Sequence, residues 1–222
     1  MPPLNEITFS VANIKTFTFN ALQENTYVVY DETKQCVIID PGCYDRDEKE
    51  VLKKFILENG LVPVALLNTH CHIDHIVGNA FVKSTFRVDL YIHPIEKEIL
   101  LSQKIFAPYF GFDHLEESEA EHFFKDEDTY NFGNTVLKIV FVPGHSPGHV
   151  AFVDEKSKSI LSGDVLFYQS IGRTDLPGGN HQTLINSIKT KLFTLENDYK
   201  VFPGHGPTTT IGFERSHNPF LK

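Results

Sequence analysis

The chain has 222 residues, 41% of them hydrophobic, which is enough for a substantial core and fits a single domain over residues 1–222. A formal net charge of -9 argues against a nucleic-acid partner, because phosphate binding needs clustered lysine and arginine. No apolar run approaches the roughly 18 residues that a membrane helix needs, so we expect no membrane partner either.

The amino-terminal segment and the cysteines indicate the compartment. Residues 1–10 lack the basic and apolar regions of a signal peptide, and the three cysteines have no paired spacing that suggests disulfides. We therefore expect a cytoplasmic protein. Eleven histidines are many for such a chain, and this excess points to chemistry.

Strand and helix patterns alternate in the first part of the chain. Residues 7–40 are rich in β-branched and aromatic residues, and residues 28–40 have the pattern of a hairpin. Residues 46–60 carry apolar side chains at helical spacing, with Gly60 as the expected C-cap. A short apolar run over residues 64–67 predicts a buried strand.

The middle of the chain is less regular. Residues 86–94 predict a strand, and a helix is expected to begin at Pro94 and run through residue 103. Residues 104–128 contain an aromatic stretch and an acidic stretch, which we interpret either as a lid or as an irregular packed connection.

The alternation returns in the last part. We expect strands over residues 135–142, 150–156 and 158–164, a helix over 183–195 and a final strand over 200–207. The whole pattern is typical of an α/β fold.

The stretch THCHIDH places four metal-ligand residues directly after the predicted strand at 64–67. His70 and His72 are two residues apart and can face one point, whereas Asp74 and His75 follow after the chain has begun to turn and can address a second. Mostly imidazole ligands suit zinc, with iron or manganese as alternatives.

Three further strand ends carry residues of the same types, in FVPGHSPGH, SILSGD and KVFPGHG. Loops at strand ends are where a rigid scaffold holds functional groups. A carboxylate such as Asp164 could bridge two ions, as in hydrolytic sites with paired metals.

Some residues near these motifs have two interpretations. Either His145 or His149 could be the ligand in the second motif, and Asp40 either orients a ligand histidine or caps backbone amides in a turn. We expect Cys71, between two ligands, to be a buried structural thiol. The remaining histidines are expected to be ordinary core or surface residues: His93, His114, His122 and His217.

The motifs together resemble the metallo-β-lactamase fold superfamily: HCHIDH, with Gly144-His145, Gly163-Asp164 and Gly204-His205. The segments 172–179 and 203–220 are most similar to the glyoxalase II-like hydrolases of the short bacterial type. The resemblance implies a four-layer αβ/βα sandwich with two metal ions. It further implies that His70, His72 and His145 hold one ion, that Asp74, His75 and His205 hold the other, and that Asp164 bridges both.

Two such ions would supply a nucleophile without a serine or cysteine, because a water between two cations loses its proton near neutral pH. Asp74 or Asp164 would then take part in moving the proton of this water. The sequence contains no GxSxG motif, so a serine nucleophile has no support as an alternative. A thioester suits this chemistry because a thiolate leaves without much help from a general acid.

The resemblance points to S-acyl derivatives of glutathione, such as S-lactoylglutathione, as small-molecule substrates of a monomer or weak homodimer. Full-length glyoxalase II enzymes have a helical carboxy-terminal domain that forms part of the glutathione site, and we expect it to be missing because only residues 206–222 follow His205. Arg173 either binds a carboxylate of the thiol or forms an ion pair with Asp175.

Rival interpretations use the same fold. NTHCHIDH and GRTD also resemble persulfide dioxygenases, in which two histidines and an aspartate hold one iron, but the PGHGP segment keeps His205 as hydrolases do. Lactonase or β-lactamase activity would use the same two ions. A non-catalytic role is disfavoured because all seven ligand positions are filled.

Overall fold

The computed structural model describes residues 11–222. Two expectations concern residues outside this range: that residues 1–10 are not a signal peptide, and that a strand begins at residue 7. Within residues 11–222, no helix is both long and apolar enough to cross a membrane.

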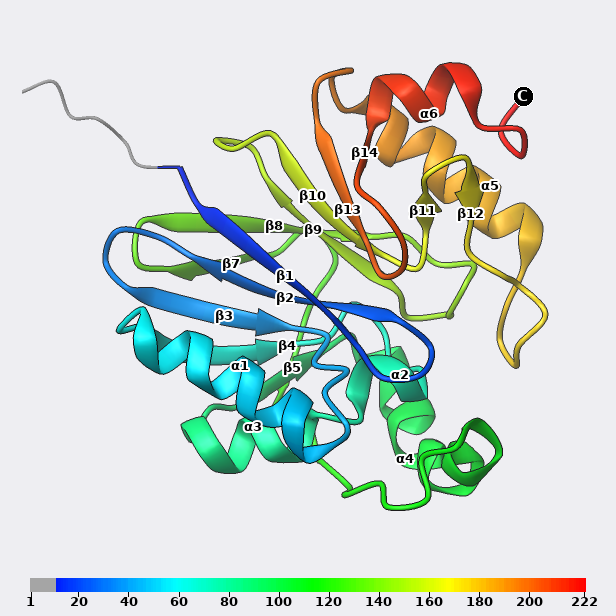
Figure 1. The fold of residues 1–222 in the computed structure, drawn as a ribbon. Coiled ribbons are helices and arrows are strands. Elements are labelled where there is room, and N and C mark those ends of the chain that lie inside the picture. The colour runs from blue at the N-terminus through cyan, green and yellow to red at the C-terminus, as the bar shows by residue number, and fades with distance from the viewer. Residues whose placement is uncertain (1–10) are drawn as a thin grey trace, which may run out of the picture.

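The first half of the chain builds a six-stranded sheet with four α-helices and two short 3₁₀ helices (Figure 1). The strands are adjacent in chain order: β1 (Asn13–Phe19), β2 (Glu24–Tyr30), β3 (Gln35–Ile39), β4 (Val62–Leu67), β5 (Leu90–Ile92) and β6 (His122–Phe123). β1 to β3 are antiparallel and β3 to β6 are parallel. The helices are α1 (Arg46–Glu58), α2 (Ile73–Ile76), α3 (Asn79–Phe86), η1 (Pro94–Glu96), α4 (Lys97–Phe106) and η2 (Ala107–Phe110).

The second half builds another six-stranded sheet, in the order β14-β13-β10-β9-β8-β7, and a two-stranded hairpin. Its strands are β7 (Thr129–Phe132), β8 (Thr135–Phe141), β9 (Val150–Asp154), β10 (Ser159–Gly163), β13 (Lys200–Pro203) and β14 (Thr209–Thr210), with β11 (Leu166–Phe167) and β12 (Ser170–Ile171) as the hairpin. Only β10 and β13 pair in parallel within this sheet. The helices are α5 (His181–Thr190), η3 (Leu192–Thr194) and α6 (Ile211–His217).

Three apolar clusters hold four layers together. One lies between the first sheet and its helices, one between the two sheets, and one between the second sheet and α5 and α6. Strand β3 shows why its sequence is apolar from Cys36 to Ile39: Cys36 and Ile38 join the first cluster, and Val37 and Ile39 join the central one. Successive side chains of a strand face opposite ways, so strands of an inner layer must be apolar on both faces.

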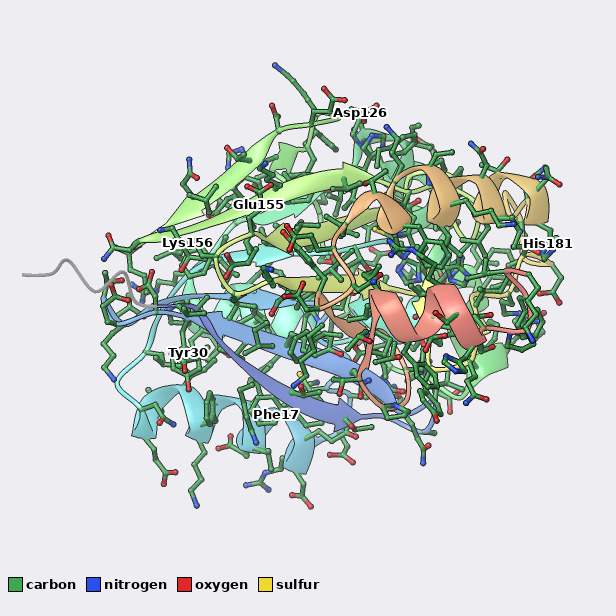
Figure 2. All side chains as sticks on the ribbon, turned by 90° about the horizontal axis from the view of Figure 1, so that it is seen from above. Phe17, Tyr30, Asp126, Glu155, Lys156 and His181 are labelled. Atoms are coloured by element: carbon green, nitrogen blue, oxygen red, sulfur yellow. The ribbon has the colours of Figure 1, made fainter. Side chains whose placement is uncertain are left out.

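The outer contacts of the first sheet can be followed from above in Figure 2. Phe17 and Tyr30 lie on the side of the sheet that α1 covers, and both rings pack edge-on against Phe55 of α1, with centroids 5.3 and 6.2 Å away. The molecule is therefore the αβ/βα sandwich that the resemblance implied, with helices on the two outer faces.

Most predicted elements of the first half are confirmed, and their ends have local causes. α1 begins with a capping box between Asp45 and Glu48, and Gly60 follows the C-cap residue Asn59 in the left-handed conformation at φ 62°. The aromatic stretch expected as a loop from residue 104 is helical up to Phe110, because α4 continues into η2.

Candidate metal centre

Four strand ends meet at one edge of the sandwich, between its two halves. The loop after β4 carries His70 and His72, and the loop after β8 carries His145. Asp164 follows β10, and His205 follows β13. The first sheet and the second sheet thus both contribute ligand-type residues to the same place.

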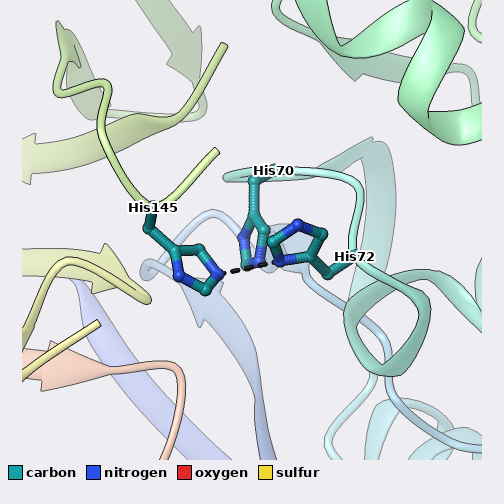
Figure 3. A group of neighbouring side chains, drawn as sticks. All are labelled: His70, His72 and His145. Atoms are coloured by element: carbon teal, nitrogen blue, oxygen red, sulfur yellow. Dashed lines mark hydrogen bonds between the residues drawn. The ribbon is translucent and has the colours of Figure 1, made fainter. Parts of the chain in front are cut away.

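His70, His72 and His145 form the first group. Their ligand nitrogens lie within 4.8 Å of one another, and the closest pair is Nδ1 of His72 and Nε2 of His145, 2.8 Å apart. Figure 3 shows the three rings turned toward one another from two separate loops. The geometry matches the first ligand set that the resemblance implied.

Asp74, His75 and His205 form the second group, again with ligand atoms within 4.8 Å of one another. Oδ2 of Asp74 lies 3.1 Å from Nε2 of His205 and 3.7 Å from Nε2 of His75. This group matches the second ligand set.

Asp164 connects the two groups. Its Oδ2 lies 3.5 Å from Nε2 of His145 in the first group and 3.5 Å from Nε2 of His205 in the second. Its Oδ1 lies 3.4 Å from Nε2 of His75. A carboxylate in this position can share its two oxygens between two cations.

Hydrogen bonds outside the two groups fix which ring nitrogen faces inward. His70, His75, His145 and His205 each have an oxygen acceptor at Nδ1, namely Thr69 Oγ1 at 3.0 Å, Asp40 Oδ2 at 3.2 Å, the Arg173 carbonyl at 2.8 Å and the Leu22 carbonyl at 3.1 Å. Each ring therefore donates its Nδ1–H outward and presents an Nε2 lone pair to the centre. His72 instead presents its Nδ1.

Unpartnered buried atoms show that the site fits metal ions. Nε2 of His70, Nε2 of His75 and Oδ1 of Asp164 are buried and have no hydrogen-bond partner. Leaving one such group unsatisfied typically costs about 1–3 kcal/mol, and three occur here side by side. Divalent ions would satisfy all three, and imidazole with carboxylate is a donor set that suits zinc, iron or manganese.

The electrostatics agree with cation binding. Burial lowers the pKa of His70 and His145, and it lowers the pKa of His72 to about 3, so these rings are neutral as metal ligands must be. Burial alone would raise the pKa of Asp164, but His75 and His145 beside it hold that pKa below its usual value. The first group thus combines neutral imidazoles with an ionised carboxylate. In the second group burial alone would lower the pKa of His75 and His205, but the carboxylates of Asp74 and Asp164 beside them raise it.

His149, the alternative ligand of the second motif, lies outside both groups. Its Nε2 accepts a hydrogen bond of 3.1 Å from the backbone N–H of Asp164, and its ring stacks on His70 with centroids 4.6 Å apart. Since that lone pair is already used, the geometry favours His145 over His149 as the candidate ligand, and His149 supports the loop that carries Asp164.

Asp40 combines its two interpretations. Its carboxylate accepts the backbone N–H of Thr69 at 2.7 Å and the Thr69 hydroxyl at 2.6 Å, and it also contacts Nδ1 of His75. Asp40 lies close enough to His70 and His75 to count as a third ligand group. Because these donors already fill its oxygens, we assign it to orienting both histidines, His75 directly and His70 through Thr69.

Two glycines explain why the ligand motifs read GD and GH. A side chain at Gly204 would place its Cβ 2.1 Å from Oδ1 of Asp164, and Gly163 has a φ of 49° with Thr69 Oγ1 only 2.4 Å from a Cβ. The ligand loops approach one another so closely that only glycine fits at these positions.

Glu96 in η1 is a residue of the site that the sequence did not reveal. Its buried carboxylate accepts the N–H of Cys71 at 2.8 Å, the N–H of Gly148 at 2.7 Å and the hydroxyl of Ser146. It therefore ties the loop of His70 and His72 to the loop of His145. In the sequence it resembles an ordinary acidic residue in the first turn of a helix, so no signal distinguished it.

The other expectations for single residues are confirmed within the described chain. Cys71 is fully buried, and burial raises the pKa of its thiol. The remaining histidines lie outside the ligand groups, and two of them pair with aspartates: His93 with Asp126, and His122 with Asp89.

A cavity of about 610 Å³ opens onto the two groups and is lined by His72, Asp74, His145, Asp164 and His205, among others. Ligand pockets of small molecules have typical volumes of about 300–1,000 Å³. Arg173 also lines the cavity, and its guanidinium forms two hydrogen bonds of 2.7 Å with Asp175. The ion pair expected as one alternative for Arg173 is thus present.

Comparisons with known proteins agree with this geometry. A family model described as the metallo-beta-lactamase superfamily matches residues 19–205. The chain is 38% identical over 217 residues to hydroxyacylglutathione hydrolase GloC of Haemophilus influenzae, covering 94% of this chain and 98% of that protein.

Two solved structures are similar over nearly their whole length. The BLEG-1 B3 metallo-beta-lactamase has a TM-score of 0.86 at 38% identity, with 95% of this chain and 100% of that chain covered. A di-iron-bound form of TTHA1623 has a TM-score of 0.83 at 37% identity, with 93% and 100% covered.

Proposed function

Because the chain belongs to the metallo-beta-lactamase superfamily, we propose that it is a binuclear metal-dependent thioesterase that hydrolyses S-acylglutathione or a similar S-acyl thiol. The observation that carries the proposal is the convergence of two ligand groups that share Asp164 at one cavity. The similarity to a protein named hydroxyacylglutathione hydrolase supports the choice of a thioester.

Divalent ions held by the seven ligands would lower the pKa of a shared water and polarise the substrate carbonyl. The chain's own residues set the rest of the geometry. Asp164 and Asp74 lie at the cavity with pKa values held below the usual range despite burial, so both are ionised at neutral pH and can accept a hydrogen bond from a water there. In the reaction, water adds to the carbonyl carbon and the C–S bond breaks. One proton of the water goes to the departing thiolate, and the other is released with the carboxylate product.

The persulfide dioxygenase alternative requires only one iron, held by two histidines and an aspartate. The complete second group, with Asp74 only 3.1 Å from His205, favours a binuclear site and therefore a hydrolase. The metal itself stays a prediction, with zinc expected first and iron or manganese as alternatives. Because a similar solved structure is a di-iron-bound form, every metal experiment should include iron-loaded protein.

The test is an assay of protein of known metal content, loaded separately with zinc, iron and manganese, on S-lactoylglutathione. We expect thioester hydrolysis that requires both ions. Oxygen uptake with glutathione persulfide by the iron-loaded protein, without thioester hydrolysis, would contradict the proposed thioesterase function.

β-Lactam hydrolysis is the second candidate, because a B3 metallo-beta-lactamase is among the similar structures. It uses the same ions on another activated carbonyl. A chromogenic cephalosporin belongs in the same assay, and turnover of it far above that of any thioester would reverse the order of the two candidates. The cytoplasmic location, the single domain and the monomeric or weakly dimeric state stay predictions.

A further inference from the structure

One wall of the cavity is a mostly apolar face of α4 and η2, interrupted by Ser102 and Gln103. Ile99, Phe106 and Phe110 recur at helical spacing along α4 and η2, and all three line the cavity. Ile73 of α2 extends the same wall to the ligand Asp74. The apolar surface therefore begins directly beside the metal-ligand residues.

The phenylalanines of this wall are not part of a packed core. Phe106 is 42% exposed and Phe110 is 40% exposed, although both are large apolar side chains. An apolar surface that lines a functional cavity and remains uncovered is typical of a ligand-binding wall.

The polar side chains on the same helix are already bonded within the helix. The hydroxyl of Ser102 donates to the carbonyl of Ile99 at 2.7 Å, and the side-chain amide of Gln103 donates to the same carbonyl at 3.2 Å. The Ser102 O–H and one N–H of Gln103 are therefore used within the helix. Among the cavity residues that the structure describes, this wall has no charged side chain beyond the metal-ligand position Asp74.

The opposite side of the cavity is formed by the β11–β12 hairpin and the loop that follows it (Figure 1). This side includes apolar side chains, but it also carries Arg173. Among the residues 11–222 that line the cavity, Arg173 is the one cationic side chain apart from the histidines. The cavity is thus asymmetric, with the arginine on one side only.

The two substituents of a thioester carbonyl diverge from the carbonyl carbon. With that carbon held at the ligand groups, the acyl chain and the thiol carrier must point to different parts of the cavity. Thiol carriers such as glutathione are polar and charged, and placing them against an apolar wall would remove their charges from water without a partner. The apolar wall is therefore the place of the acyl chain.

We propose that the wall of Ile73, Ile99, Phe106 and Phe110 selects thioesters with an apolar acyl chain of several carbons over short hydroxyacyl groups such as lactoyl. This inference rests on the proposed thioesterase function. The physical basis is that burial of each methylene against the apolar side chains of the wall stabilises the bound state, whereas the short lactoyl group has few carbons to bury there.

The experiment uses protein with two bound ions and a grid of substrates: acetyl, butanoyl, hexanoyl and lactoyl thioesters, each on glutathione and on the uncharged carrier N-acetylcysteamine. We expect kcat/KM to rise with acyl length on both carriers, by up to about fourfold for each added methylene. Lactoyl should rank with the shortest acyl groups.

The outcomes separate the two claims. If no thioester is hydrolysed, the proposed function fails. If all are hydrolysed with similar kcat/KM, or if lactoyl exceeds hexanoyl, the thioesterase stands and the acyl-selecting wall is overturned.

Neighbouring residues provide matched variants. Phe106→Ala and Phe110→Ala should lower the hexanoyl-to-acetyl ratio of kcat/KM by about tenfold, while Tyr109→Ala, at a side chain that is 84% exposed and outside the cavity, should leave it unchanged. Because both phenylalanines are partly exposed, we expect all three variants to fold and to keep two ions. An unchanged ratio in Phe106→Ala and Phe110→Ala, or an equal loss in Tyr109→Ala, would contradict the proposal.

Discussion

The side chain of Asp164 contacts both ligand groups. Its oxygens lie 3.5 Å or less from ring nitrogens of His75, His145 and His205. These histidines come from three different segments: His75 from α2, His145 from the loop after β8 and His205 from the loop after β13. The backbone N–H of Asp164 is held in turn by His149. A single carboxylate thus sets the spacing between the proposed ions.

Asp164→Ala tests that role. We expect fewer than two bound ions per chain and thioester hydrolysis reduced by at least about 100-fold, because loss of a ligand exceeds the 10–100-fold effect typical of supporting residues. Metal analysis and kcat/KM of the same sample measure both quantities, with Asp113→Ala at an exposed position as the control. Two retained ions with full activity would refute the bridge.

His149→Ala separates a supporting residue from a ligand. Because His149 binds the backbone of Asp164 and lies outside the ligand groups, the variant should still bind two ions, with affinity lowered about tenfold. A competition titration with a chelator measures this. Loss of one full equivalent of metal at saturation would move the ligand assignment to His149.

The pair of Arg173 and Asp175 predicts opposite effects of two variants. If Arg173 binds a carboxylate of the thiol, Arg173→Ala should raise KM for glutathione thioesters about tenfold, and Asp175→Asn should lower it by freeing the guanidinium. Neither variant should alter KM for an N-acetylcysteamine thioester. Unchanged KM values in both variants would contradict binding of the thiol carboxylate by Arg173. Its remaining roles would be the ion pair with Asp175 and the backbone carbonyl that accepts a hydrogen bond from His145.

At the scale of elements, the site depends on how firmly the loops after β4 and β8 are joined. Glu96 joins them through three hydrogen bonds, and burial raises its pKa while those donors favour the charged form. The first ligand group draws on these two loops alone. Its geometry should therefore be more sensitive to Glu96 than that of the second group.

Glu96→Gln should lower the free energy of unfolding by about 3 kcal/mol, because an amide nitrogen would face a backbone N–H in place of an acceptor oxygen. It should also weaken binding of one ion more than the other. Two-step metal titrations and chemical denaturation check both effects, and Glu98→Gln on an exposed turn of α4 is the control. Equal weakening of both ions would argue against a specific role at the first group.

The sequence predicted the elements and ligands whose signals are local. α1 has its apolar spacing and caps, β3 and β4 have unbroken apolar runs, and the ligands follow strand ends in compact motifs. β6 and β14 have two residues each and no pattern of their own, so only tertiary pairing defines them. Glu96 acts through its contact with Cys71, and Thr69 through its contact with Asp40; both contacts join separate loops, which no spacing along the chain reveals.

At the scale of the whole molecule, the centre lies where the two halves of the sandwich meet. His70, His72, Asp74 and His75 come from the first half, and His145, Asp164 and His205 come from the second. Bound ions would therefore link the halves, in addition to the central apolar cluster that contains side chains from both sheets.

Removing the ions should lower the melting temperature by about 10 °C while leaving one cooperative transition. Ligand at about 1,000 times its Kd stabilises a fold by about 4 kcal/mol, and 1 kcal/mol shifts the transition of a chain this size by about 2–4 °C. Calorimetry with and without a chelator measures the shift. Two separate transitions would contradict a single domain built on a shared central cluster.

The most direct test of the central claim is a titration of metal-free protein with zinc or iron while hydrolysis of a thioester is followed. Two ligand groups that share Asp164 predict that activity depends on both ions and reaches its maximum at two equivalents per chain. Full activity at one equivalent, or two bound equivalents without any hydrolysis of a thioester, would contradict the binuclear thioesterase.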